Sequence, residues 1–383
     1  MKNLLIISSF ALSTLAFADN WNGVNNPHKL EKGTGVKIVT EFSALPLVAK
    51  LSNQHYIWSD TWWRNPWGGI SYRWNAEPNP ENFTYRTLTR EEVMSASLST
   101  LEKLSATEKY DIFMGNYDYP LTRRVRSLYN PRQEWWEGIC HGWSMAAIAH
   151  VEPARNDLPN SDGVVVPFGS TDVKALLGFY YAKIHKTEKS TQIGSRCRIP
   201  GKVPGEAYPQ DDVRFEPPFF LRGGSCADLN AGAFHLALTN MIGLQNKGLV
   251  VEIDRYADIW NQPVGEFASE VVSTKTTRRG SEVRIKMTMT YGEEAVTMDA
   301  ESREDEEHGF VSMDPVTGTI NNLTRARTYE YTLELDRAGK ITGGEWHSNT
   351  RPDFLWVKEG AATFSNEDFG LAGLNQIYRP VID

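Results

Sequence analysis

Cysteine is scarce in this chain, and several other features are absent. Three cysteines, Cys140, Cys197 and Cys226, stand among 383 residues, and no zinc-type cluster of Cys and His occurs, so we expect no metal and no other cofactor. After the N-terminus no apolar run is long enough to cross a bilayer, which argues against an integral membrane anchor. The formal net charge of −8, without a basic stripe, argues against a nucleic-acid binder.

The first residues have the pattern of a secretory signal peptide. Residues 1–3 are a short positive start, residues 4–15 are largely apolar, and residues 16–18 match a small-x-small cleavage signal before Asp19. The apolar run is too short to span a membrane. We therefore expect residues 1–18 to be removed and the mature protein to be secreted, extracellular or periplasmic, into an oxidising compartment.

An odd number of cysteines in an oxidising compartment leaves at least one thiol unpaired. Cys197 and Cys226 lie in polar, loop-like sequence and would close a loop of moderate length, so we expect a disulfide between them. Cys140 is then the free thiol. An unpaired cysteine is often only a small buried hydrophobe, so the neighbours of Cys140 decide between a structural and a reactive role.

The neighbours of Cys140 favour a reactive thiol. Gly138 and Gly142 flank it in the sequence GICHGW, and an apolar stretch follows at residues 145–150. This pattern predicts a tight turn into a helix over residues 140–151. The backbone N–H groups and the dipole of a helix start favour the thiolate, and the glycines would let a substrate approach the sulfur. We therefore predict that Cys140 is a nucleophile.

A nucleophilic cysteine needs a base, and the base needs a group that orients it. His141 is adjacent to Cys140, and neighbouring side chains diverge at a helix start, so it is a poor base. His235 lies in an apolar segment with several small residues, where a histidine is either a satisfied core residue or a buried base. Polar residues that could orient the imidazole follow at Asp254, Asp258 and Asn261. Cys and His followed by Asp or Asn is the papain-like order.

Periodicity along the chain predicts helices first and strands afterwards. Helices are predicted at residues 91–110, with Thr89 as N-cap, and at 140–151 and 173–185. Residues 230–245 are predicted to be a buried helix or a junction between a helix and a strand. Strands are predicted at 249–254, 282–291 and 328–335, the last joined by a hairpin to Trp346. We therefore predict an α+β fold with a catalytic helical lobe at 19–265 and an antiparallel, β-rich lobe at 266–383 packed on the same catalytic unit.

Several motifs occur together in the order of one known family. Residues 258–264, with the sequence DIWNQPV, resemble the core of the elicitor peptide of the transglutaminase elicitor family, which oomycete plant pathogens secrete and which marine bacteria share. Further similar motifs are WSDTWW at 58–63, GICHGW at 138–143, AFH at 233–235 and RPDFLW at 351–356. By itself, the segment 260–264 also predicts a rigid aromatic–proline turn after a strand. The chain departs from the elicitor peptide after Val264, which bears on host recognition and not on the chemistry.

The resemblance implies a papain-like, two-lobed protein-glutamine γ-glutamyltransferase. It implies that Cys140 is the nucleophile and His235 the base, but it does not fix the third member, for which we favour Asp254, with Asp258 and Asn261 as alternatives. The thiolate would form a thioester with a substrate glutamine, and a lysine amine would resolve it into an isopeptide bond. The partners would be protein substrates, a glutamine donor and a lysine acceptor, including host or cell-surface proteins.

Two other functions fit the same sequence. A secreted papain-like cysteine protease or amidase would use the same thiol and base, with water as the acceptor. A non-catalytic secreted binding protein would need neither residue.

Overall fold

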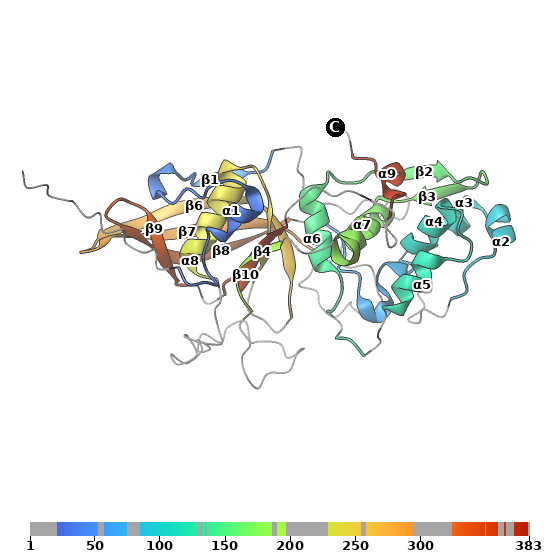
Figure 1. Cartoon of the computed structure of the whole chain (residues 1–383), viewed down its shortest axis with the longest axis horizontal. Coiled ribbons are helices and arrows are strands. Elements are labelled where there is room, and N and C mark those ends of the chain that lie inside the picture. The colour runs from blue at the N-terminus through green and yellow to red at the C-terminus, as the bar shows by residue number, and fades with distance from the viewer. Residues whose placement is uncertain are drawn as a thin grey trace, which may run out of the picture.

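An antiparallel sheet forms one half of the molecule, and a group of short helices forms the other half (Figure 1). The computed structural model describes residues 21–52, 57–74, 85–128, 130, 132–134, 136–185, 190–196, 229–253, 258–294, 324–348, 350–358, 364 and 371–381. The predicted mixture of helices and antiparallel strands is confirmed. Within these residues no helix has both the length and the apolar character that a membrane crossing requires.

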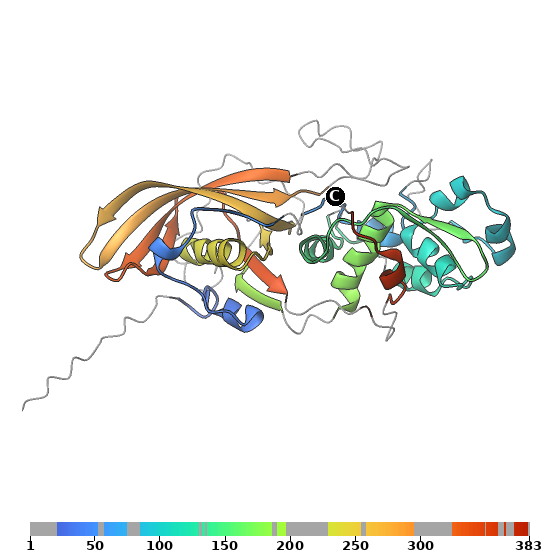
Figure 2. The ribbon, with the colours of Figure 1, turned by 90° about the horizontal axis from the view of Figure 1, so that it is seen from above.

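The sheet has eight strands, in the order β4–β10–β5–β6–β7–β8–β9, with β1 paired to β6. Its members are β1 (Val48–Lys50), β4 (Ser190–Gly194), β5 (Leu249–Glu252), β6 (Asn261–Thr276), β7 (Gly280–Gly292), β8 (Thr324–Asp336), β9 (Ile341–Trp346) and β10 (Phe354–Lys358). The long strands arch over α8 (Ala231–Leu238), which packs against β8 and β9 (Figure 2). The helix α1 (Lys29–Thr34) packs against β4 and β10.

The alternation predicted in the two long strands is confirmed. The buried residues of β7 include Val283, Ile285, Met287 and Met289, and those of β8 are Tyr329, Tyr331, Leu333 and Leu335. The register pairs Met287 with Tyr329 and Ile285 with Tyr331, so both sets lie on one face of the sheet. Side chains alternate across a strand, so this face forms the core that α8 covers.

The helical half is built from short helices around one hydrophobic cluster. They are α2 (Arg90–Ser95), α3 (Leu98–Glu102), α4 (Ala106–Phe113), α5 (Pro120–Ser127), α6 (Cys140–Ala149), α7 (Ser170–Phe179) and α9 (Leu374–Ile377). The hairpin of β2 (Asn156–Pro159) and β3 (Val165–Phe168) lies beside them. Short 3₁₀ turns are η1 (Phe42–Ala44), η2 (Asn65–Trp67) and η3 (Gly69–Ser71). The π-helical turns η4 (Tyr180–Ile184) and η6 (Thr239–Leu244) extend α7 and α8. The helix predicted at 173–185 is confirmed, and of the two alternatives predicted for 230–245 the structure shows the helix.

The segment 91–110, predicted as one helix, is three short helices instead. Thr89 caps α2 as predicted, in a capping box with Glu92. Ser97 caps α3, and Ser105 caps α4 by accepting from the backbone N–H of Glu108. A serine hydroxyl that accepts a backbone N–H competes with the helical ladder, so the chain starts a new helix at each serine.

The two halves are not consecutive along the chain. The hydrophobic cluster of the sheet half includes Leu30 near the N-terminus, and the cluster of the helical half includes Leu371 near the C-terminus. The boundary predicted between residues 265 and 266 falls inside β6. Residues 261–264, predicted as a turn, are paired with β5. Pro263 is tolerated there because it lies near the start of the strand.

Candidate active site

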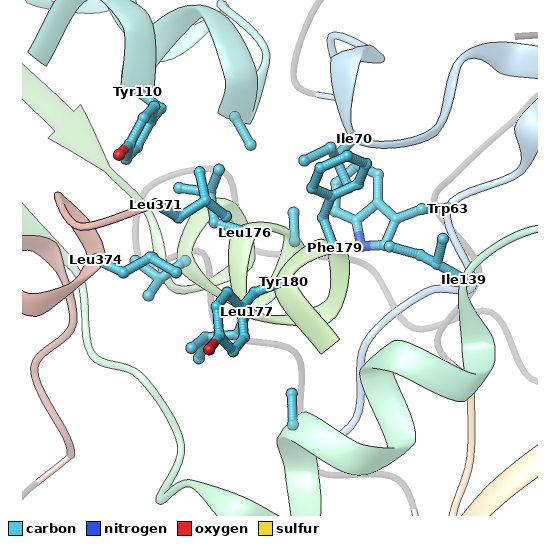
Figure 3. Packing of buried hydrophobic residues seen from close by; sticks show 14 of the residues in the cluster. Trp63, Ile70, Tyr110, Ile139, Leu176, Leu177, Phe179, Tyr180, Leu371 and Leu374 are labelled. Carbon is cyan, nitrogen blue, oxygen red and sulfur yellow. The ribbon is translucent and has the colours of Figure 1, made fainter. Parts of the chain in front are cut away.

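Cys140 is the first residue of α6, where the sequence predicted a helix to begin. Ile139, the residue before it, is buried against the helical core, where Trp63, Ile70 and Phe179 lie around it (Figure 3). The Ile139 N–H donates to the carbonyl oxygen of Trp62 at 2.7 Å. The start of α6 is therefore fixed both by packing and by a backbone hydrogen bond.

The two glycines beside Cys140 allow close backbone packing. A Cβ on Gly138 would lie 2.1 Å from the carbonyl oxygen of Trp62, and one on Gly142 would lie 2.1 Å from that of Gly178 in α7. The sequence predicted instead that these glycines open space for a substrate. In the structure, that space is filled by neighbouring backbone, and α6 sits tightly on α7.

The thiol of Cys140 lies under the segment that leads into β6. Only 6% of the residue is exposed, and the thiol faces the carbonyl oxygen of Ile259 at 3.7 Å. The Asn261 Nδ2 atom donates to Sγ at 3.7 Å, and the Asn261 Oδ1 atom accepts from the indole N–H of Trp356 at 2.8 Å. The sulfur is thus covered by residues 259–261. It contacts the amide of Asn261, which a hydrogen bond from Trp356 in β10 holds in place.

Burial keeps this thiol protonated. Desolvation raises the pKa of Cys140 to about 11, and the negative charge of Glu294 raises it as well. Hydrogen bonds from Asn261 and from the backbone of His141 act in the opposite direction. The sequence predicted that the helix start would favour the thiolate, but in this conformation the loss of water outweighs the helix start.

A second ionisable group lies near the thiol. Burial raises the pKa of the Glu294 carboxyl to about 8, and a hydrogen bond from the Gln262 amide opposes that rise. Glu294 follows β7, and Gln262 follows Asn261 in β6. The sequence did not predict Glu294, Gln262 or Trp356 as site residues. Two of them belong to motifs that carry the resemblance: Gln262 lies within DIWNQPV at 258–264, and Trp356 is the last residue of RPDFLW at 351–356.

His235, predicted as the base, lies in the core of the sheet half. Its Nδ1 atom shares a hydrogen bond with the Tyr331 hydroxyl at 2.8 Å, and its ring packs on Phe42 with centroids 5.9 Å apart. Burial lowers the pKa of His235 to about 3. In the part of the chain that the structure describes, no hydrogen bond joins His235 to Cys140. The structure therefore does not bring the predicted nucleophile and base together.

The other predicted site residues divide between the site and the rest of the chain. Asp254 lies outside the described residues. Asp258 immediately precedes the segment 259–261 along the chain, and Asn261 contacts the sulfur directly. Burial lowers the pKa of His141 to about 4, and the positive charges of Lys183 and Lys358 lower it as well.

The structure describes only some of the residues on which the predictions about the disulfide and the metal depend. Cys140 is a free thiol, whereas Cys197 and Cys226 lie outside the described residues, as does the predicted signal peptide at 1–18. Among the residues that the structure places, no group of three or more His, Cys, Asp or Glu side chains is arranged to hold a metal ion.

Comparisons with known proteins identify a family. The family model described as transglutaminase elicitor matches residues 27–374. The crystal structure of the GP42 transglutaminase from Phytophthora sojae is similar to this chain, with a TM-score of 0.62 and 20% identity, covering 93% of this chain and 97% of that one. At this identity the likeness shows a shared fold. No curated protein matches. The family model spans most of the sequence, and the chain therefore belongs to the transglutaminase elicitor family.

Proposed function

We propose that this protein is a secreted protein-glutamine γ-glutamyltransferase with Cys140 as its nucleophile. The observation that carries the proposal is a free thiol at the first turn of α6, in contact with an amide donor, in a chain of the transglutaminase elicitor family. Its substrates are proteins that offer a glutamine side chain as donor and a lysine amine as acceptor.

The reaction follows from the chemistry of the thiol. A general base takes the proton of Cys140, the sulfur attacks the carboxamide carbon of the donor glutamine, and the protonated base becomes the general acid of the next step. The oxyanion is stabilised by the N–H groups of Cys140 and His141, the first two of α6, which come before the first backbone hydrogen bonds of the helix, those of Gly142 and Trp143 to Ile139. Ammonia leaves with a proton from the general acid, and a thioester remains. A lysine amine then attacks the thioester, releases the thiolate and forms the isopeptide bond.

An amine competes with water only at a site from which water is excluded. Cys140 is buried, and the indoles of Trp62 and Trp260 pack edge to face beside it, with centroids 5.4 Å apart. The Ile259 carbonyl oxygen lies 3.7 Å from the sulfur, so the residues that precede β6, 259–260, must move before a substrate reaches the thiol, whereas Asn261 stays paired in β6. This cover supports transfer to an amine over hydrolysis.

The papain-like arrangement, with His235 as base and Asp254 behind it, stays a prediction from the resemblance. The Nε2 atom of His235 has no hydrogen-bond partner among the described residues, whereas Nδ1 is held by Tyr331. A His235→Gln variant tests the assignment. If His235 is the base, amine incorporation falls by a factor of roughly 100 or more while the variant stays folded. A loss no larger than that of Tyr331→Phe would remove His235 from the mechanism.

The function itself is tested by incubating the full chain with a glutamine-containing peptide and a labelled primary amine. We expect the label to become attached at glutamine, and we expect Cys140→Ser to abolish attachment. Conversion of glutamine to glutamate without label would indicate an amidase, and cleavage of the peptide backbone would indicate a protease. A Cys140→Ala variant indistinguishable from the wild type in every activity would indicate a binding protein.

A further inference from the structure

The side chain of Asn261 lies between the thiol of Cys140 and the indole of Trp356, and its orientation is determined. An indole N–H donates and never accepts. Trp356 Nε1 lies 2.8 Å from Asn261 Oδ1, so the oxygen of the amide is already engaged by a donor. The amide nitrogen must then face the sulfur, at 3.7 Å. A hydrogen-bond network of this kind distinguishes the two ends of an asparagine amide.

Three neighbouring strands hold this pair in place. Asn261 starts β6 and pairs with Glu252 of β5, and Trp356 in β10 pairs with Val250 of the same strand. The helix α6, which carries Cys140, packs on β5 and β6. The amide and the sulfur are therefore brought together by helix-on-sheet packing and not by a loop, and such elements keep a donor in a fixed place.

We infer that Asn261 is a catalytic residue whose Nδ2 donates first to the Cys140 thiolate and then to the oxyanion of the thioester-forming step. In this arrangement Trp356 is a positioning residue, because it acts through the amide that it orients. Donation to the oxyanion rests on the proposed transferase function, whereas donation to the thiolate does not.

The Asn261 amide can donate to both the thiolate and the oxyanion for a geometric reason. The oxyanion forms on the carbon that has just become bonded to sulfur, so a donor beside the sulfur is also beside the oxyanion. The amide is neutral and pre-oriented, and it gives up no proton during the reaction. Removal of one such donor from an oxyanion site lowers kcat by roughly 100- to 1,000-fold.

The test compares four variants of the full chain. Asn261→Ala removes the donor, Asn261→Asp replaces it by a carboxylate, and Trp356→Phe keeps an aromatic ring but frees the amide to rotate. The control is Trp346→Phe, which removes an equivalent indole hydrogen bond to the Leu229 carbonyl oxygen in the sheet half. Thermal unfolding of each variant is recorded to show that it is folded. If a substitution at Asn261 prevents folding, the comparison of Trp356→Phe with Trp346→Phe still tests the inference.

The first readout is the pH profile of iodoacetamide labelling at the Cys140 peptide, followed by mass spectrometry. We expect the thiol pKa to rise in Asn261→Ala, to rise further in Asn261→Asp, and to rise least in Trp356→Phe, while Trp346→Phe leaves it unchanged. Other groups that act on this thiol are Glu294, the backbone of Asn261 and the backbone of His141, and all four variants retain them. Lys183 and Lys358 act on His141 and are retained as well. An unchanged profile in Asn261→Ala overturns the inference.

The second readout is amine incorporation, with kcat and KM determined separately. We expect Asn261→Ala to lower kcat by roughly 100-fold with KM within a few-fold of the wild type, because the donor acts on the transition state. A rise in KM with kcat unchanged overturns the catalytic role. If the wild type incorporates no amine, the proposed function fails, and the labelling profile still decides whether Asn261 stabilises the thiolate.

Discussion

Gly142 in α6 lies directly against Gly178 in α7, so that a Cβ on Gly142 would come within 2.1 Å of the Gly178 carbonyl oxygen. We predict that Gly142→Ala forces the two helices apart and lowers the free energy of unfolding by about 1–3 kcal/mol. Because Cys140 begins the same helix, the displacement also reduces amine incorporation. Chemical denaturation and the incorporation assay measure the two effects.

A matched control for this substitution is Gly23→Ala, because a Cβ on Gly23 would meet nothing within 4 Å. We expect the Gly23 variant to change stability by no more than about 0.5 kcal/mol, as is usual for surface positions. Equal effects of the two substitutions would show that the contact between α6 and α7 does not constrain the site.

Glu294 acts on the Cys140 thiol through its charge, and its own pKa is raised to about 8 by burial. We predict that Glu294→Gln lowers the thiol pKa, because it removes a negative charge that opposes the thiolate. The labelling rate at pH 9 should rise roughly threefold or more. Below about pH 7 the wild-type carboxyl is protonated, so the two proteins should react alike.

The comparison variant is Glu282→Gln, which removes an exposed carboxylate paired with Lys275 at 3.3 Å. It should leave labelling of Cys140 unchanged at every pH, because exposed charges are screened by solvent. A rate difference for Glu294→Gln that persists at pH 6 would mean that charge is not the cause.

Local patterns in the sequence predicted the long strands and the start of α6. Alternation over Val283 to Met289 is visible without a structure because the side-chain period of a strand is two. The turn before Cys140 is visible because apolar residues follow it at once. The breaks at Ser97 and Ser105 were missed, since a serine in a periodic segment indicates neither a cap nor a helical position by itself.

Contacts between distant strands account for what the sequence did not predict at the site. Asn261 and Trp356 are 95 residues apart and meet only because β10 and β6 flank β5. His235 lies in a segment whose apolar character indicated burial, but the partner of its ring, Tyr331, comes from a strand 96 residues later. A sequence indicates that a histidine is buried more readily than it indicates which residue it meets.

Lys109 and Asp172 form a buried ion pair in the helical half, with Nζ and Oδ2 2.6 Å apart and at most 2% of either side chain exposed. Asp172 also accepts from the indole of Trp74 and from the N–H of Gly169. We predict that Asp172→Ala lowers the free energy of unfolding by about 3–5 kcal/mol, because it leaves the ammonium buried without its counter-charge. Urea denaturation measures this change.

Removal of the carboxylate from an exposed ion pair is the control for the loss of stability in Asp172→Ala. Glu330→Ala removes the partner of Arg284 on the surface of the sheet, where both side chains are at least 40% exposed. We expect it to cost much less than Asp172→Ala, because solvent screens the charges of an exposed pair. A similar cost for the two variants would show that burial adds nothing to the Lys109–Asp172 pair.

His235 should make the fold sensitive to acid. Burial lowers its pKa from 6.5 to about 3, so the folded state holds a neutral imidazole while the unfolded chain takes up a proton. The stability contributed by His235 is therefore complete above pH 6.5 and falls by about 1.4 kcal/mol per pH unit as the pH drops toward 3. Between pH 4 and 6, the slope of the free energy of unfolding against pH should be smaller in His235→Gln than in the wild type, by about 1.4 kcal/mol per pH unit. The exposed His347→Gln should keep the wild-type slope, and equal slopes in all three proteins would contradict the assignment.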